Sequence, residues 1–235
     1  MISLNLPEQT APYMTETAAQ STTKPKAKRA RAAKIPAGFV YEVLFGQPIY
    51  YRGYREAIAN NYPPEHVIGS GRKQAYLIDL LLGFFKSVLD RKKFATAVSE
   101  PGVKLGNKDY VSNDIIIYNA ADKSRMFVDE YFDFPPQVVV EVDTKAELKD
   151  LDWGNEYYMH KTERLLEFGV ERVIWIFTGM RKILSAEKGK PWITVDWDDA
   201  VEVLPGCTLD LRRLIEADGV GVDEFFPRKS DKPTL

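Results

Sequence analysis

Cysteine and histidine are scarce in this sequence of 235 residues, which contains one cysteine and two histidines. The single cysteine, Cys207, excludes an internal disulfide bond and is typical of a protein in a reducing cytoplasm. His66 and His160 are too far apart in the sequence to indicate a zinc site, whose ligands usually come in closely spaced pairs. Neither residue type therefore argues for a disulfide-stabilised or zinc-binding protein.

A long apolar run is also missing. No segment reaches the length of a membrane span, and the N-terminus lacks the apolar core of a signal peptide, so we expect a cytoplasmic protein. The formal net charge is −2, which gives no global basic signature for nucleic acid. A metal-dependent nuclease can nevertheless confine its positive charge to one cleft. At this length, a content of 45% hydrophobic residues is enough for the core of one domain.

The two ends of the chain differ in composition from its middle. Residues 1–37 include a polar, basic stretch from Ser21 to Arg31 with few large apolar groups, which predicts a disordered N-terminal tail. Such a tail either steers nucleic acid electrostatically or serves only as a solubilising arm. Residues 218–235 are predicted to be a loose C-terminal tail, which leaves residues 38–217 as one domain.

Two carboxylates accompany short apolar runs that read as buried strands. Asp114 opens the run Ile115-Ile116-Ile117, and Glu141 follows Val138-Val139-Val140. Both runs are β-branched and bounded by turn signals. A carboxylate in a buried strand is costly unless it is paired, protonated or bound to a metal, and two such groups on neighbouring strands repel each other. The pattern favours a divalent-metal site, as a phosphodiester-cleaving enzyme needs; the alternative is an exposed or paired carboxylate at a strand end.

Lys161 and Gln74 are the polar residues that fall on apolar helix faces. Residues 151–168 have helical periodicity, and Lys161 lies on the inward stripe with Tyr158 and Leu165. A lysine in that position either extends its amino group to solvent or meets a buried anion. Gln74 lies on the core stripe of the helix predicted over residues 72–90, near its start. It either contributes to the same site or is an ordinary helix-start residue.

Periodicity and turn signals together predict an α/β (α+β) domain with a central mixed β-sheet flanked by helices. The predicted elements are a hairpin over residues 39–51 that turns near residues 46–48, a helix over 72–90, strands near 96–104, 114–118 and 138–142, a helix over 151–168, a hairpin of strands 173–177 and 182–187, an edge strand over 192–197 and a last helix over 209–216.

Several short motifs appear in an order that resembles the PD-(D/E)XK, restriction-endonuclease-like superfamily. The sequence is most similar to a family of presumed restriction endonucleases that is greatly expanded in photosynthetic bacteria. The resemblance covers roughly residues 39–216. The motifs that carry it are residues 41–46 (Tyr-Glu to Gly), Gln74, Asn113-Asp114, residues 139–142 (Val-Val-Glu-Val), Lys161 followed by Gly169-Val170, residues 171–177, 204–206 and 209–215.

The resemblance implies a restriction-endonuclease-like core and metal-assisted hydrolysis of phosphodiester bonds. Asp114, Glu141 and the backbone carbonyl of Val142 would hold one or two Mg²⁺ (or Mn²⁺) ions. Lys161 would orient the attacking water or stabilise charge on the scissile phosphate. Glu42 would assist the metal or hold the lysine. The alternative interpretation is that Glu42 is an ordinary strand residue that faces solvent. The substrate would be nucleic acid, most simply DNA.

Position 143 departs from the family pattern. Asp143 stands where members with Glu-X-Lys carry the catalytic lysine, and strand alternation predicts that it faces the same side as Glu141, as a further ligand or a repelling neighbour. Lys161 is the substitute that we favour, and Lys145 is a second candidate. Without a working lysine, the domain would be a catalytically weak or inactive module that binds nucleic acid or a protein partner. The sequence leaves open whether the chain acts as a homodimer.

Overall fold

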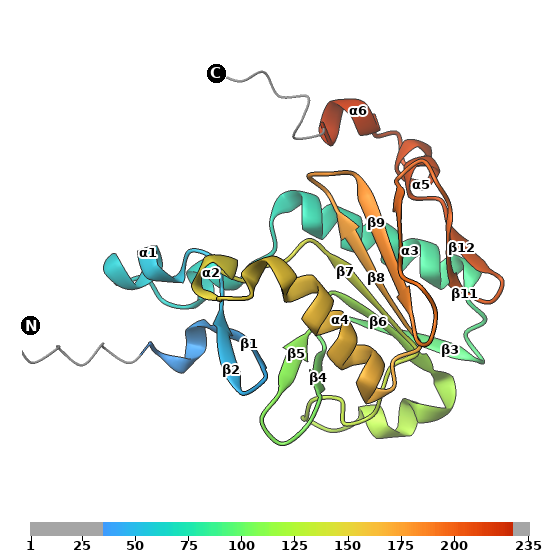
Figure 1. Ribbon diagram of the computed structural model, residues 1–235. Helices are drawn as coiled ribbons and strands as arrows, with labels where there is room; N and C mark the ends of the chain where they lie inside the picture. The colour runs from blue at the N-terminus through green and yellow to red at the C-terminus, as the bar shows by residue number, and fades with distance from the viewer. Residues whose placement is uncertain (1–34, 228–235) are drawn as a thin grey trace, which may run out of the picture. The chain divides into compact units, whose positions relative to one another are not determined.

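A six-stranded mixed sheet forms the centre of the domain in the computed structural model, which describes residues 35–227 (Figure 1). The predicted N-terminal tail falls outside these residues up to position 34, whereas the predicted C-terminal tail falls outside them only from position 228. The strand order is β10-β9-β8-β7-β6-β3, and β7 and β8 are parallel while the other neighbours are antiparallel. This confirms the predicted mixed sheet. Its strands are β3 (Phe94–Val98), β6 (Ile115–Asn119), β7 (Val138–Val142), β8 (Arg172–Phe177), β9 (Lys182–Glu187) and β10 (Ile193–Asp196).

Helices cover both faces of this sheet, with α4 (Tyr157–Phe168) in front of it and α3 (Arg72–Val88) behind it in Figure 1. Side chains alternate between the two faces, as the pleat of a strand requires. Val140 belongs to the hydrophobic core that contains α3, and its neighbour Val139 belongs to the core that contains α4. Continuing the alternation, Glu141 faces the α4 side of the sheet.

A smaller sheet of order β2-β1-β5-β4 brings a second set of strands to the α4 side. The predicted hairpin at its edge is present, but it turns at Phe45 and Gly46, whose φ angles are 55° and 70°. The Asp109 carboxylate accepts both backbone N–H groups of this turn, at 3.1 and 2.7 Å. The strands are β1 (Val40–Leu44), β2 (Gln47–Tyr50), β4 (Gly102–Lys104) and β5 (Tyr110–Ser112).

The strand expected near residues 96–104 is divided between the two sheets. Its first part is β3 of the large sheet and its last part is β4 of the small one. Ser99 and Glu100 have φ angles of 71° and 58°, and Pro101 follows them. Positive φ and proline both interrupt an extended strand, so the chain turns from one sheet to the other at this point.

The helix expected from residue 151 begins only at Tyr157. Two 3-10 turns, Leu148–Asp150 and Gly154–Glu156, precede it. A Cβ atom at Gly154 would lie 2.1 Å from the backbone oxygen of Leu148, so only glycine allows this approach. The two turns therefore replace the first part of the longer helix that was expected from residue 151.

The C-terminal part contains structure that the sequence patterns did not predict. Residues from 218 were expected to form a loose tail, but the side chains of Val222 and Phe226 are buried against the α3 side of the sheet. Cys207 is buried as a free thiol. No helix of the described part is both long and apolar enough to cross a membrane. The remaining elements are α1 (Tyr54–Ala59), α2 (Glu65–Ile68), β11 (Val201–Leu204), β12 (Cys207–Leu209), α5 (Leu211–Ala217) and α6 (Val222–Phe225).

Candidate functional site

The pairing of β6 with β7 brings Asp114 and Glu141 together. Ile115 pairs with Val140 in this antiparallel ladder, and one step further along the same register Asp114 stands opposite Glu141. Directly opposed residues of an antiparallel pair point to the same face of a sheet. Both side chains are almost fully buried, with exposures of 5% and 1%. Two acidic groups therefore share one buried place at the end of the two strands.

Asp114 is held by a backbone group and by Gln74. The backbone N–H of Val142 donates to Oδ2 of Asp114 at 2.7 Å. Nε2 of Gln74 lies 3.1 and 3.2 Å from the two carboxylate oxygens and donates to the carbonyl of Val142 at 3.0 Å. Burial raises the pKa of Asp114, and the hydrogen bonds from Val142 and Gln74 offset part of this effect. Gln74 thus reaches from α3 to the predicted metal ligands.

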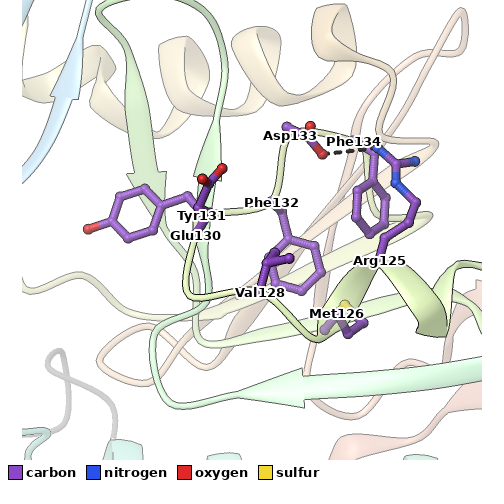
Figure 2. Close-up of a pocket in the computed structure, with 8 residues that line it drawn as sticks. All are labelled: Arg125, Met126, Val128, Glu130, Tyr131, Phe132, Asp133 and Phe134. Atoms are coloured by element: carbon purple, nitrogen blue, oxygen red, sulfur yellow. Dashed lines mark hydrogen bonds and ion pairs between the residues drawn. The ribbon is translucent and has the colours of Figure 1, made fainter.

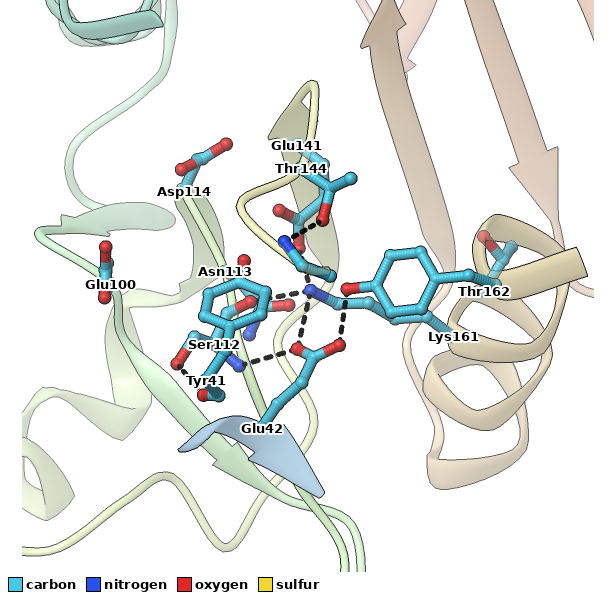
Figure 3. Close-up of polar contacts among 12 residues, drawn as sticks. Tyr41, Glu42, Glu100, Ser112, Asn113, Asp114, Glu141, Thr144, Lys161 and Thr162 are labelled. Atoms are coloured by element: carbon cyan, nitrogen blue, oxygen red, sulfur yellow. Dashed lines mark hydrogen bonds and ion pairs between the residues drawn. The ribbon is translucent and has the colours of Figure 1, made fainter. Parts of the chain in front are cut away.

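Lys161 points inward from α4 and is completely buried. Its Nζ atom lies 3.1 Å from Oε2 of Glu42 and 3.0 Å from Oε1 of Glu141, and it donates to the carbonyl of Ser112 at 2.7 Å. Figure 3 shows these side chains converging from β1, β7 and α4. The lysine therefore meets buried anions rather than solvent, as one of the two sequence alternatives required.

Glu42 is also fully buried and is bonded on both carboxylate oxygens. The Tyr157 hydroxyl donates to Oε1, and the backbone N–H of Ser112 donates to Oε2 at 3.3 Å. The β1–β2 register shifts between Val40 and Glu42. This irregularity accompanies a carboxylate that points into the protein, so the alternative of a solvent-facing Glu42 is wrong.

The charges in this cluster do not balance. Burial, together with the negative charges of Asp114 and Glu42, raises the pKa of Glu141 to about 8, although Lys161 acts in the opposite direction. Burial alone would lower the pKa of Lys161, but the carboxylates of Glu141 and Glu42 outweigh it and raise that pKa. Two of the three carboxyl groups thus contact the one ammonium group inside the cluster, and Asp114 is also influenced by the charge of Lys145 from outside it.

The oxygen atoms of this cluster are of the chemical type that a divalent cation prefers. Two carboxylates and the Val142 carbonyl are hard ligands of the kind that Mg²⁺ and Mn²⁺ prefer. Oε1 of Glu141 forms the ion pair with Lys161 but makes no well-formed hydrogen bond with any described residue. Within residues 35–227, no group of three or more His, Cys, Asp or Glu side chains could hold a metal ion. A metal here would depend on two carboxylates, a carbonyl and water.

Asp143 and Lys145 do not follow the predicted strand alternation. β7 ends at Val142, and Asp143 has a φ of 55°. The Asp143 carboxylate accepts hydrogen bonds from the backbone N–H of Thr178, at 3.0 Å, and from its hydroxyl. Its expected position beside Glu141 is therefore wrong. Lys145 forms an ion pair with Glu100, and its positive charge acts on Asp114 from that side.

Several partners in the cluster were not identified from the sequence. Tyr157 lies four residues before Lys161, and this helical spacing was a usable signal for a shared face. The carbonyl of Ser112 and the N–H groups of Ser112 and Val142 are backbone atoms, which residue types do not reveal. Glu100, the ion-pair partner of Lys145, lies in the turn that separates β3 from β4.

A cavity of about 290 Å³ is lined by the segment that precedes β7 and shares no lining residue with the acidic cluster (Figure 2). The Arg125 guanidinium stacks over the Phe134 ring at 3.8 Å and pairs with Asp133 at 2.9 Å. None of the predicted site residues lines this cavity.

Comparison with known proteins gives matches among solved structures alone. No protein-family model and no curated protein matches the sequence. Among the solved structures that match is a candidate nuclease belonging to DUF820, from Anabaena variabilis ATCC 29413. The two chains are 15% identical, the match covers 74% of this chain and 89% of that one, and the TM-score is 0.54. At this identity, the likeness shows the shared fold alone.

Proposed function

We propose that the protein is a metal-dependent nuclease that hydrolyses phosphodiester bonds of DNA. The observation that carries this proposal is the buried meeting of Asp114 and Glu141 on paired strands, beside Lys161. The likeness to a candidate nuclease supports the same class of activity. The arrangement agrees with the resemblance to restriction-endonuclease-like proteins that the sequence motifs indicated.

Each residue of the cluster has a distinct role in this proposal. Asp114, Glu141 and the Val142 carbonyl would hold Mg²⁺ or Mn²⁺, which supplies Lewis-acid chemistry to the phosphate and a more acidic bound water. Gln74 orients Asp114 and the Val142 carbonyl through its amide group. Lys161 balances the charge of Glu141 and Glu42 and orients the Glu141 carboxylate. Because its Nζ already has three partners, Lys161 acts on the reaction through Glu141.

A binding module without efficient chemistry is the second candidate function. Two observations favour it: the amino group of Lys161 is fully engaged by protein atoms, and position 143 carries an aspartate that is turned towards Thr178. In this alternative, the buried cluster maintains the fold, and the protein binds nucleic acid or a protein partner without cutting.

We expect purified protein to cut plasmid DNA in Mg²⁺ or Mn²⁺ and not in EDTA. Asp114→Asn should lower the rate by roughly 10²-fold or more, because the loss of one carboxylate removes a ligand charge from the ion. Agarose-gel assays on supercoiled plasmid and on single-stranded circular DNA measure this. The matched control is Asp133→Asn, since Asp133 pairs with Arg125 in the separate cavity. Equal loss in both variants, or a wild type that cuts neither DNA nor RNA, would contradict the nuclease proposal.

We also expect Mg²⁺ to raise the melting temperature. An ion that binds only the folded state stabilises it by about 2.7 kcal/mol at one hundred times its dissociation constant, which is roughly 5–10 °C for a domain of this size. Differential scanning fluorimetry with increasing Mg²⁺ measures the shift, and Asp114→Asn should remove most of it. A melting temperature indifferent to Mg²⁺ and Mn²⁺ would favour the binding module.

A further inference from the structure

Two neighbouring cavities lie at the start of α3. The first, which we call the basic cleft, has a volume of about 530 Å³, and its wall includes Arg52, Arg72, Lys73, Gln74 and Lys145. The second, which we call the apolar pocket, has a volume of about 210 Å³ and is lined by Tyr76, Val220, Phe225 and Phe226. Arg72 and Lys73 line both cavities, so the two adjoin at the start of the helix.

The basic cleft concentrates positive charge in a protein of net charge −2. Four of its lining side chains are cationic, and of these Lys145 is paired with Glu100. The carboxylate in its wall, Asp143, is turned towards Thr178. A concave surface with charge of one sign attracts ligands of the opposite sign. Gln74 connects this wall to the acidic cluster, because its amide group holds Asp114. A phosphate chain in the cleft would therefore pass next to the proposed metal ligands.

The apolar pocket presents an aromatic surface beside these cations. Phe225 is 52% exposed, although it belongs to a helix that packs on the core. Phe226 is buried, and Nζ of Lys73 lies 5.0 Å over its ring while donating to the carbonyl of Phe225. Cationic grooves with adjacent aromatic side chains are the features that bind single-stranded nucleic acid, since an unpaired base can stack on an exposed ring. Bases in a duplex are already stacked on each other.

We propose that this surface binds single-stranded nucleic acid, with phosphates in the basic cleft and an unpaired base stacked on Phe225 in the apolar pocket. The proposal rests on the nuclease function, because it names the substrate class of the same site. A recess of this size suits a few nucleotides of an unpaired strand or a frayed end, whereas a duplex would have to lie across its mouth.

Fluorescence anisotropy with the full chain in EDTA tests this inference. The probes are labelled oligothymidine, labelled oligouridine and a blunt DNA duplex of the same length. We expect tighter binding of one or both single strands than of the duplex. Phe225→Ala should weaken single-strand binding about 5- to 100-fold, the effect of losing one base stack, and leave duplex binding unchanged. Oligothymidine and oligouridine differ in the base methyl group as well as in the sugar, so the comparison identifies the preferred strand and not the preferred sugar by itself.

Substitutions at the same position separate stacking from packing. Phe225→Tyr keeps an aromatic face and should bind like the wild type, whereas Phe225→Leu keeps apolar bulk and should bind like Phe225→Ala. Phe127→Ala is the matched control, because Phe127 is 88% exposed and lines neither cavity. Duplex binding as tight as single-strand binding, or equal losses in Phe225→Ala and Phe127→Ala, would overturn the inference. If the same wild-type protein still cuts plasmid DNA in Mg²⁺ or Mn²⁺, the nuclease proposal survives that outcome.

Discussion

Lys161→Met should lower the free energy of unfolding by about 3–5 kcal/mol, the usual cost of removing one partner from a buried ion pair. The change leaves Glu42 and Glu141 facing each other without a cation, and both carboxyl groups are buried. It also leaves the Ser112 carbonyl without the donor that it has in the wild type. Urea denaturation in EDTA at neutral pH measures the loss.

Lys145→Met is the matched control for this prediction. Lys145 is also a partly enclosed lysine near the cluster, but it forms an ion pair with Glu100, whose side chain is 25% exposed. We expect a cost of only about 1 kcal/mol there. Adding Glu42→Gln to Lys161→Met should recover part of the stability, because it removes a buried carboxylate that has lost its cation. Equal costs for the two lysine variants would show that Lys161 does not balance buried carboxylates.

The central strands of the fold were predictable because local and tertiary signals agree there. Residues 138–142 and 173–177 are short β-branched or aromatic runs, and each is buried on both faces of the sheet. The turn between β8 and β9 contains Gly179, which indicates a hairpin turn in the sequence. Lys161 was predicted to point inward for a related reason, since its helical position coincides with the apolar stripe that packs on the sheet.

The parts that were missed depend on backbone conformations that residue types specify weakly. The positive φ of Asp143 turns its side chain towards Thr178, and no alternation rule applies beyond such a residue. The same holds at Ser99 and Glu100, where one expected strand becomes two strands in different sheets. The burial of Val222 and Phe226 is decided by packing between segments far apart in the sequence.

Glu141→Gln should make the metal-free protein less sensitive to alkaline pH. Burial, with the charge of Asp114, raises the pKa of Glu141 from its ordinary 4.5 to about 8, so the folded state holds this proton more tightly than the unfolded state. The resulting stability is fully present below about pH 4.5 and is lost as the pH rises to about 8. The amide of the variant cannot ionise, so urea denaturation in EDTA should show a flatter profile and a variant more stable than the wild type at the alkaline end.

The same Glu141→Gln substitution should abolish most cleavage, so stability and activity would change in opposite directions. An amide oxygen carries no net charge, and its binding to Mg²⁺ is much weaker than that of the carboxylate, which should lower turnover by roughly 10²-fold or more. Plasmid cleavage in Mg²⁺ measures this, and Gln137→Glu serves as a control for a change of charge elsewhere next to β7. A variant that is stabilised at alkaline pH yet cuts like the wild type would show that Glu141 is buried for structural reasons and is not a metal ligand. A stabilised variant that does not cut would show that the buried Glu141 carboxylate destabilises the metal-free fold but is needed to bind the ion.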